Sequence, residues 1–183
     1  RLGAALCDSS GAAGFDVGQV EWAVKLQDQQ NALFWDAQNG GYFSTSGQDK
    51  NVLLRMKEDY DGAEPSPNSA AALNLLRLAA MLDKSAWREQ AGQTMHAFDA
   101  QLNQSPTALP QMLVALNWSR ARPKQIVIAG KYRAPNTEAQ LRDVHPQFIQ
   151  KQATIPSVSS PLQKSLAWQS ARQRAVRRIA TRA

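Results

Sequence analysis

The sequence predicts a mainly α-helical fold followed by a small C-terminal α/β appendix. Apolar residues recur at helical spacing through most of the first two thirds of the chain, and glycine, proline and serine separate these stretches. Beyond them, short β-branched runs end at Gly130 and before Pro156. We therefore divide the chain into a helical-hairpin segment over 1–120, an α/β appendix over 121–158 and a basic tail over 159–183.

The first helix is predicted over 17–34, and Gly40 and Gly41 follow as a helix stop. Its apolar residues fall on two sides of the helix. One side carries Val20, Ala23 and Val24, and the other carries Trp22, Leu26 and Leu33. Residues 42–45 and 52–55, separated by a polar stretch, are predicted to form a short hairpin or an irregular excursion.

Three further helices are predicted over 67–82, 85–103 and 106–119. Ser66 suits the N-cap of the first and Pro67 its first position. This helix is apolar on both faces, which indicates a buried helix. The second helix carries large side chains at helical spacing, namely Trp87, Ala91, Met95, Phe98 and Leu102.

The appendix begins with a β-branched run over 125–129, which predicts a buried strand. A capping box at Thr137 opens a helix that Pro146 should end or kink. Residues 152–155 are a candidate second strand. Residues 162–180 have helical propensity but few large apolar groups, so we do not expect them in a tight core.

Charge divides unevenly along the chain. The 117 N-terminal residues hold 8 Lys/Arg and 13 Asp/Glu, a net charge of −5, whereas residues 118–183 hold 13 and 2, a net charge of +11. Such a basic block forms a solvated face or tail, or contacts nucleic acid or an anionic membrane. Without zinc-ligand spacing, an RNA-binding aromatic motif or a heptad, the sequence gives no clear nucleic-acid partner. A run of about 20 apolar residues is also missing, so no membrane span is expected.

Few residues suggest metal or redox chemistry. Cys7 is the single cysteine, so we expect a small buried side chain and a cytoplasmic location with reduced thiols. His96 and His145 are isolated in the sequence and make neither a metal site nor a triad. The sequence holds no phosphate-binding glycine loop. We therefore expect no cofactor and no metal ligands.

Three sets of short segments carry a resemblance to a known family. The longest segment is residues 57–69, KEDYDGAEPSPNS. The second set is LFWD at 33–36 with GGYF at 40–43, and the third is PQML at 110–113 with the run 124–130. Together they resemble the thioredoxin-domain-containing family of spermatogenesis-associated protein 20. The resemblance implies an upstream thioredoxin-like domain joined to an (α/α)6 toroid of the six-hairpin glycosidase type, of which this chain would be the last part.

The resemblance implies two different functions and leaves open whether the chain is an enzyme. In the first, a loop-lined cleft of the toroid binds or processes carbohydrate. In the second, the chain is a non-catalytic structural or protein-interaction module. The chain has no Cys-x-x-Cys motif, so a redox role of the thioredoxin-like domain is not encoded here. The resemblance also fades after about residue 152.

The polar stretch before the 67–82 helix is the candidate site, because it places charged groups at the mouth of a buried helix. The candidate catalytic carboxylates for acid/base work on a sugar are Asp59, Asp61 and Glu64. These acidic residues could equally favour the helix dipole and cap backbone amides. The candidate substrate-binding residues are Trp35, Tyr42, Lys57, Tyr60 and Asn68. The aromatic residues could instead anchor the core or loops, and Lys57 could pair with an acidic neighbour.

A part of a toroid would lack some of its neighbouring helices. Because the 67–82 helix is apolar all round, we expect some of its leucines to be exposed or covered by another chain. These leucines are Leu73, Leu75, Leu76 and Leu78.

Overall fold

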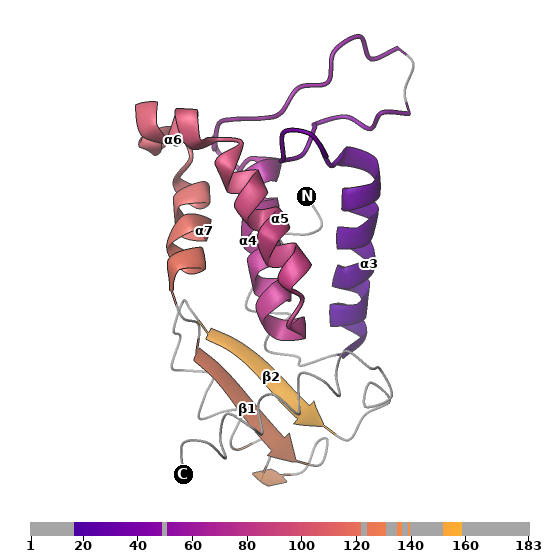
Figure 1. The fold of residues 1–183 in the computed structure, drawn as a ribbon. Coiled ribbons are helices and arrows are strands. Elements are labelled where there is room, and N and C mark those ends of the chain that lie inside the picture. Colours follow the sequence, from indigo (N-terminus) through magenta and orange to yellow (C-terminus); the bar gives the residue numbers. More distant parts are fainter. Residues whose placement is uncertain are drawn as a thin grey trace. The chain divides into compact units, whose positions relative to one another are not determined.

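The computed structural model of the chain describes residues 17–48, 51–121, 124–130 and 152–158, together with residues 135, 136 and 139 (Figure 1). Its elements divide between two compact units. The first unit is helical, and its elements are α3 (Val17–Phe34), α4 (Pro67–Leu82), α5 (Ser85–His96), α6 (Asp99–Gln104), the 3₁₀ helix η1 (Pro106–Ala108) and α7 (Pro110–Arg120). The last three residues of α4 group with the second unit. The prediction of a mainly α-helical chain is confirmed.

The second unit holds two strands, β1 (Lys124–Gly130) and β2 (Gln152–Val158). They pair in parallel, with Lys124 opposite Gln152 and Gly130 opposite Val158. Both lie where the sequence predicts strands, but β2 continues through Pro156 instead of ending before it. A two-stranded sheet has only edge strands, where a proline that donates no hydrogen bond is tolerated.

The helices α3 and α4 have the bounds that the sequence predicts. At the start of α4 the Ser66 hydroxyl accepts the Ser69 backbone N–H at 3.2 Å, which confirms Ser66 as the N-cap. Asp83 follows α4 with a φ of 55°, and the Lys84 N–H donates to the Ala79 carbonyl at 3.2 Å. This left-handed residue and its backbone hydrogen bond close the helix.

The predicted helix over 85–103 is wrong, because it is interrupted between α5 and α6. Ala97 and Phe98 form a turn, and the Phe98 N–H donates to the Met95 carbonyl at 3.1 Å. Phe98 is buried, and a Cβ on Gly41 would lie only 3.5 Å from its ring. The break therefore places this ring beside the glycine loop that follows α3.

The predicted helix over 106–119 is also divided. Pro106 opens η1, and Pro110 opens α7, with one residue between the two helices. Proline disfavours the helical conformation in the residue before it, and Leu109 accordingly has φ −131° and ψ 57°. The sequence therefore contains two helix starts where the prediction had one.

The expectation of exposed leucines on α4 is wrong. Leu73, Leu75, Leu76 and Leu78 are each at most 4 % exposed. Other large buried apolar side chains come from α5 and α7, including Trp87, Met95, Met112 and Trp118. The leucines of α4 are thus buried within the chain itself, together with side chains of α5 and α7.

Some predictions fall on residues outside the described ranges. They concern Cys7, His145, the basic tail and, apart from residues 135, 136 and 139, the helix predicted around Thr137. The described helices include none that is both long and apolar enough to cross a membrane.

Candidate functional site

A short glycine-containing loop joins the end of α3 to the rest of the site. Trp35 and Tyr42 form an antiparallel bridge, and the Asp36 N–H donates to the Gly41 carbonyl at 2.9 Å. Gly40 and Gly41 have φ values of 70° and 78°, which side-chain-bearing residues rarely adopt. A Cβ on Gly40 would also lie 2.6 Å from the Gln93 carbonyl oxygen. The loop therefore needs glycine for its conformation and for its close approach to α5.

Lys57 forms an ion pair across this loop. Its Nζ lies 2.8 Å from Asp36 Oδ2 and also donates to the Gly40 carbonyl oxygen. The Lys57 ammonium, aided by the N–H groups of Gln38 and Asn39, holds the pKa of the Asp36 carboxyl well below its usual range despite the opposing effect of burial. The salt bridge predicted for Lys57 is present, but its partner lies 21 residues earlier instead of among its neighbours.

Tyr42 is 1 % exposed and is held inside the helical unit. Its hydroxyl donates to Asn31 Oδ1 at 2.7 Å and accepts from Gln27 Nε2 at 3.2 Å. Its ring meets Trp35 edge to face, with 5.2 Å between the ring centroids. Burial raises the pKa of the Tyr42 hydroxyl. Both faces of its ring are thus unavailable to a sugar in this arrangement.

Asn68 is fully buried in the first turn of α4. Its Oδ1 accepts the Tyr42 backbone N–H at 2.6 Å, and its Nδ2 donates to the Tyr42 carbonyl at 3.0 Å. Its Nδ2 is also within 3.4 Å of the Glu58 carbonyl oxygen. The side-chain amide therefore pairs with the loop backbone as a neighbouring strand would.

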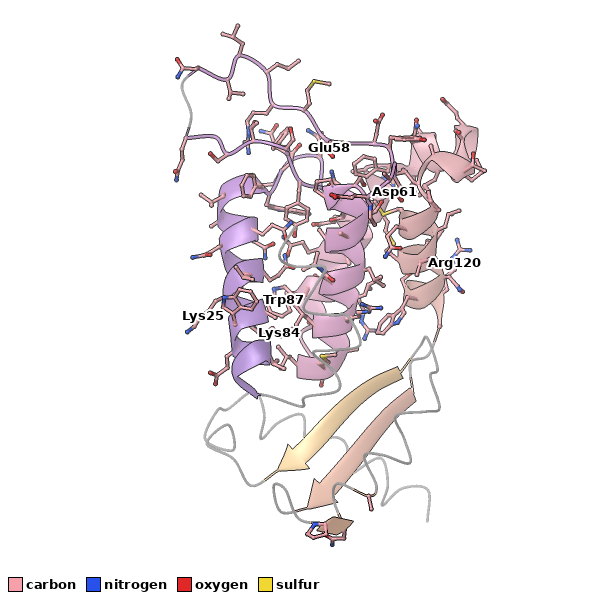
Figure 2. The ribbon with its side chains drawn as sticks, turned by 180° about the vertical axis from the view of Figure 1, so that it is seen from behind. Lys25, Glu58, Asp61, Lys84, Trp87 and Arg120 are labelled. Carbon is pink, nitrogen blue, oxygen red and sulfur yellow. The ribbon has the colours of Figure 1, made fainter. Side chains whose placement is uncertain are left out.

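Asp61 is also buried, at the junction of α4 and α7 (Figure 2). Its Oδ1 accepts the Ser66 N–H at 2.7 Å, and its Oδ2 accepts the Gln111 N–H at 2.8 Å. Its own N–H donates to the Ala108 carbonyl at 2.7 Å. Gln111 lies in the first turn of α7, where a negative charge is favoured by the helix dipole. Both carboxylate oxygens of Asp61 thus bind backbone amides.

The other candidate residues lie at the surface. Asp59 and Glu64 are exposed, and Tyr60 is 64 % exposed. A Cβ on Gly62 would lie 3.4 Å from the Tyr60 ring, so the ring rests beside that glycine. Trp35 is half-buried. The structure therefore gathers Asp36, Tyr42, Lys57 and Asn68 into one hydrogen-bonded cluster, with Trp35 packed against Tyr42. Asp59, Tyr60 and Glu64 are exposed outside this cluster.

Sequence reasoning missed two residues that build the site. Asp36 lies three residues before Asn39, a spacing at which an aspartate side chain accepts backbone amides in a turn. Arg55 stacks over Phe43 at 4.0 Å and donates to the carbonyl oxygens of Thr45 and Leu33. Alternation along an extended segment could have suggested that Arg55 and Lys57 point the same way.

The described residues contain no group of three or more His, Cys, Asp and Glu side chains placed to hold a metal ion. His96 instead contacts Asp99, with 2.6 Å between Nδ1 and Oδ2, across the break between α5 and α6.

No protein-family model matches the chain. It is 41% identical over 143 residues to spermatogenesis-associated protein 20 of Homo sapiens and 39% identical over 143 residues to the Mus musculus protein. It is also 34% identical over 161 residues to a Caenorhabditis elegans protein described as uncharacterized. The chain spans only 18% of the length of the mammalian relatives and 22% of the nematode one. The chain is therefore homologous to a partial region of spermatogenesis-associated protein 20.

Proposed function

We propose that residues 17–121 form a non-catalytic structural and interaction module within a longer, thioredoxin-domain-containing protein. The observation that carries this proposal is the hydrogen bonding of Asp61 to two backbone amides. Asp61 is the most buried of the three candidate catalytic carboxylates. Each of its oxygens accepts a backbone N–H, one from the start of α4 and one from the start of α7. Such an aspartate ties two helix ends together, and both of its oxygens are engaged in doing so.

The same pattern extends to the other buried polar residues. Asp36 accepts hydrogen bonds from Lys57 and from two backbone amides, and Asn68 pairs with the backbone of Tyr42. A general acid or base needs access to the proton that it transfers. Side chains used in this way instead fix the loops at one end of the helices.

The wider architecture belongs to the same proposal. The helical unit would be the C-terminal part of an (α/α)6 toroid, and a thioredoxin-like domain would precede it in the complete protein. The segments that carry the family resemblance support this view, and so does the homology to part of a much longer protein. We keep a cytoplasmic location as part of the proposal.

Carbohydrate binding is the second candidate function. The exposed stretch of Asp59 and Tyr60 favours it, because this stretch lies between two anchored residues, Lys57 and Asp61. An exposed tyrosine ring on a fixed backbone can stack on the C–H face of a sugar. Asp59 and Glu64 would then contact hydroxyl groups or act on the glycosidic bond.

Isothermal titration and thermal unfolding together separate the two candidates. A panel of mono- and oligosaccharides is titrated into the chain and into Tyr60→Ala, while Asp61→Asn and the matched control Asp59→Asn are melted. The structural role predicts no saturable heat and a lower melting temperature for Asp61→Asn alone. A saturable heat that Tyr60→Ala abolishes would establish the carbohydrate candidate. Unchanged melting of Asp61→Asn would overturn the structural one.

A further inference from the structure

The helical unit exposes large apolar side chains beside the candidate site. They lie on the loop between the glycine turn and α4 and on the outer side of α3, and we call them the apolar rim: Trp22 (44 % exposed), Leu33 (36 %), Leu53 (100 %), Leu54 (74 %) and Met56 (64 %). In Figures 1 and 2 this loop stands away from the helices. Large exposed apolar side chains that share one loop and one helix, unlike single surface leucines, are typical of an interaction surface.

The loop is held firmly at its base. The Ser44 N–H and hydroxyl both bond the Met56 carbonyl oxygen, at 2.8 and 3.0 Å. The Arg55 guanidinium donates twice to the Thr45 carbonyl oxygen, at 2.9 and 3.1 Å, and once to that of Leu33 at 3.3 Å. These contacts fix the backbone from which the apolar side chains project.

Side chains alternate along this extended segment. Arg55 and Lys57 point toward the helical unit, where they contact the Phe43 ring at 4.0 and 5.1 Å. Leu54 and Met56 occupy the opposite side and are exposed. Two cations already hold the segment in place. A partner that binds Leu54 and Met56 would therefore cause little further loss of backbone conformational entropy. Such preorganisation is typical of a recognition element.

The rim continues onto α3 through Arg55. Its bond to the Leu33 carbonyl joins the loop to the last turn of α3, where Leu33 itself is exposed. Trp22 lies eleven residues earlier, or about three turns, so it occupies the same face of the helix. A partner that covers the loop can therefore continue along α3.

The relatives indicate which partner is available. Of the 183 residues, 143 match the human relative, so at most 40 lie outside the match and the loop from Leu53 to Met56 lies within it. The matched region is 18% of that protein. The longer relative thus carries this loop together with more than four times as much additional chain, which is held close by covalent linkage and so at high effective concentration.

We propose that the apolar rim docks onto another part of the same longer polypeptide, at an apolar surface with basic residues at its edge. The basic edge is expected because Glu58 and Asp59 are exposed next to Met56. This inference rests on the proposed structural and interaction function and names its partner. A second copy of the chain is the competing occupant.

Photocrosslinking in the full-length human relative tests the docking. A benzophenone amino acid replaces the residue aligned with Leu54 and, as a matched control, the residue aligned with Gln48, which is exposed in the same loop. An equal amount of isotope-labelled protein separates crosslinks within one chain from crosslinks between chains. We expect within-chain crosslinks to peptides outside the matched region, with about five-fold higher yield from the Leu54 position.

Three results would overturn the docking: crosslinks mainly between chains, crosslinks confined to the matched region, or equal yields from both positions.

A second experiment measures the melting temperature of the 183-residue chain with Leu54→Ser and Met56→Ser combined. The melting temperature should stay unchanged, because both side chains are exposed. A lower melting temperature would contradict their assignment to a free surface. Saccharide binding would overturn the proposed function without affecting the crosslinks, so the two failures are distinguishable.

Discussion

The ion pair between Asp36 and Lys57 offers the sharpest test of how this site is built. The change is Asp36→Asn, which preserves the shape of the side chain and removes its charge. The new amide oxygen can still accept the N–H groups of Gln38 and Asn39, which bond Asp36 at 2.9 and 3.2 Å. Its amide nitrogen, however, would face the Lys57 ammonium, donor against donor.

The expected loss follows from the burial of the pair. A hydrogen bond to a charged group contributes about 1.5–3 kcal/mol, and removing one partner of a fully buried ion pair costs about 3–5 kcal/mol. The side chains of Lys57 and Asp36 are 19% and 9% exposed, so water still reaches the ammonium. We therefore expect Asp36→Asn to lower the free energy of unfolding by about 2 kcal/mol.

Urea unfolding followed by circular dichroism measures this loss. The control is Asp59→Asn, because Asp59 is exposed and only two residues from Lys57, and its change should stay within about 0.5 kcal/mol. The pKa of Asp36 is lower in the folded chain than in the unfolded one. Its contribution is therefore complete above the ordinary aspartate pKa and declines as the pH falls. The difference between wild type and Asp36→Asn should shrink between about pH 5 and pH 3. Equal stability of the two aspartate variants, or a difference independent of pH, would refute the reasoning.

Three further substitutions test the neighbouring contacts by the same unfolding assay. Gly40→Ala should lower the free energy of unfolding by about 2–4 kcal/mol, because it combines a left-handed backbone with a clash against α5. The control Gly62→Ala meets no such clash and should lower it far less. Similar losses for the two variants would contradict the glycine requirement. Tyr42→Phe should cost about 1–2 kcal/mol through the lost hydroxyl bonds. Because burial raises the pKa of Tyr42, that cost should diminish above about pH 10, where the unfolded wild type ionises; a constant difference would count against burial of the hydroxyl. Ser66→Ala should cost about 1 kcal/mol through the lost N-cap, and no change would show that the cap is not needed.

Helix bounds could be predicted from the sequence where the signals are local. The Ser66–Pro67 pair begins α4, and the glycines after α3 end the helical pattern. The break at Phe98 could not be predicted in this way. Phe98 continues the helical spacing of the apolar residues before it, so only its packing beside Gly41 distinguishes a turn from a continuing helix. Pro110, by contrast, was a local signal that the prediction of a single helix overlooked.

The position of the site could be predicted better than its contacts. The polar stretch before α4 and the glycine loop after α3 do lie together, as the hydrogen bonds of Asn68 to Tyr42 show. The partner of Lys57 is 21 residues away, and Gln111 is 50 residues from Asp61. No local pattern specifies such long-range pairs, so the sequence could not show which charged groups are engaged.

These pairs bear on how the acidic residues of the site should be interpreted. A cluster of carboxylates before a helix suggests acid/base chemistry only while its lone pairs are available to a ligand. In Asp61 both oxygens accept backbone amides, which leaves Asp59 and Glu64 as the exposed candidates for such chemistry. An exposed carboxylate lies in bulk water, whereas acid/base catalysis is favoured in a site from which water is excluded. Catalysis would then require a second surface that closes over these residues and excludes water. A docking partner on the neighbouring apolar rim is one source of that surface, so the crosslinking experiment also bears on whether the carbohydrate candidate can be catalytic.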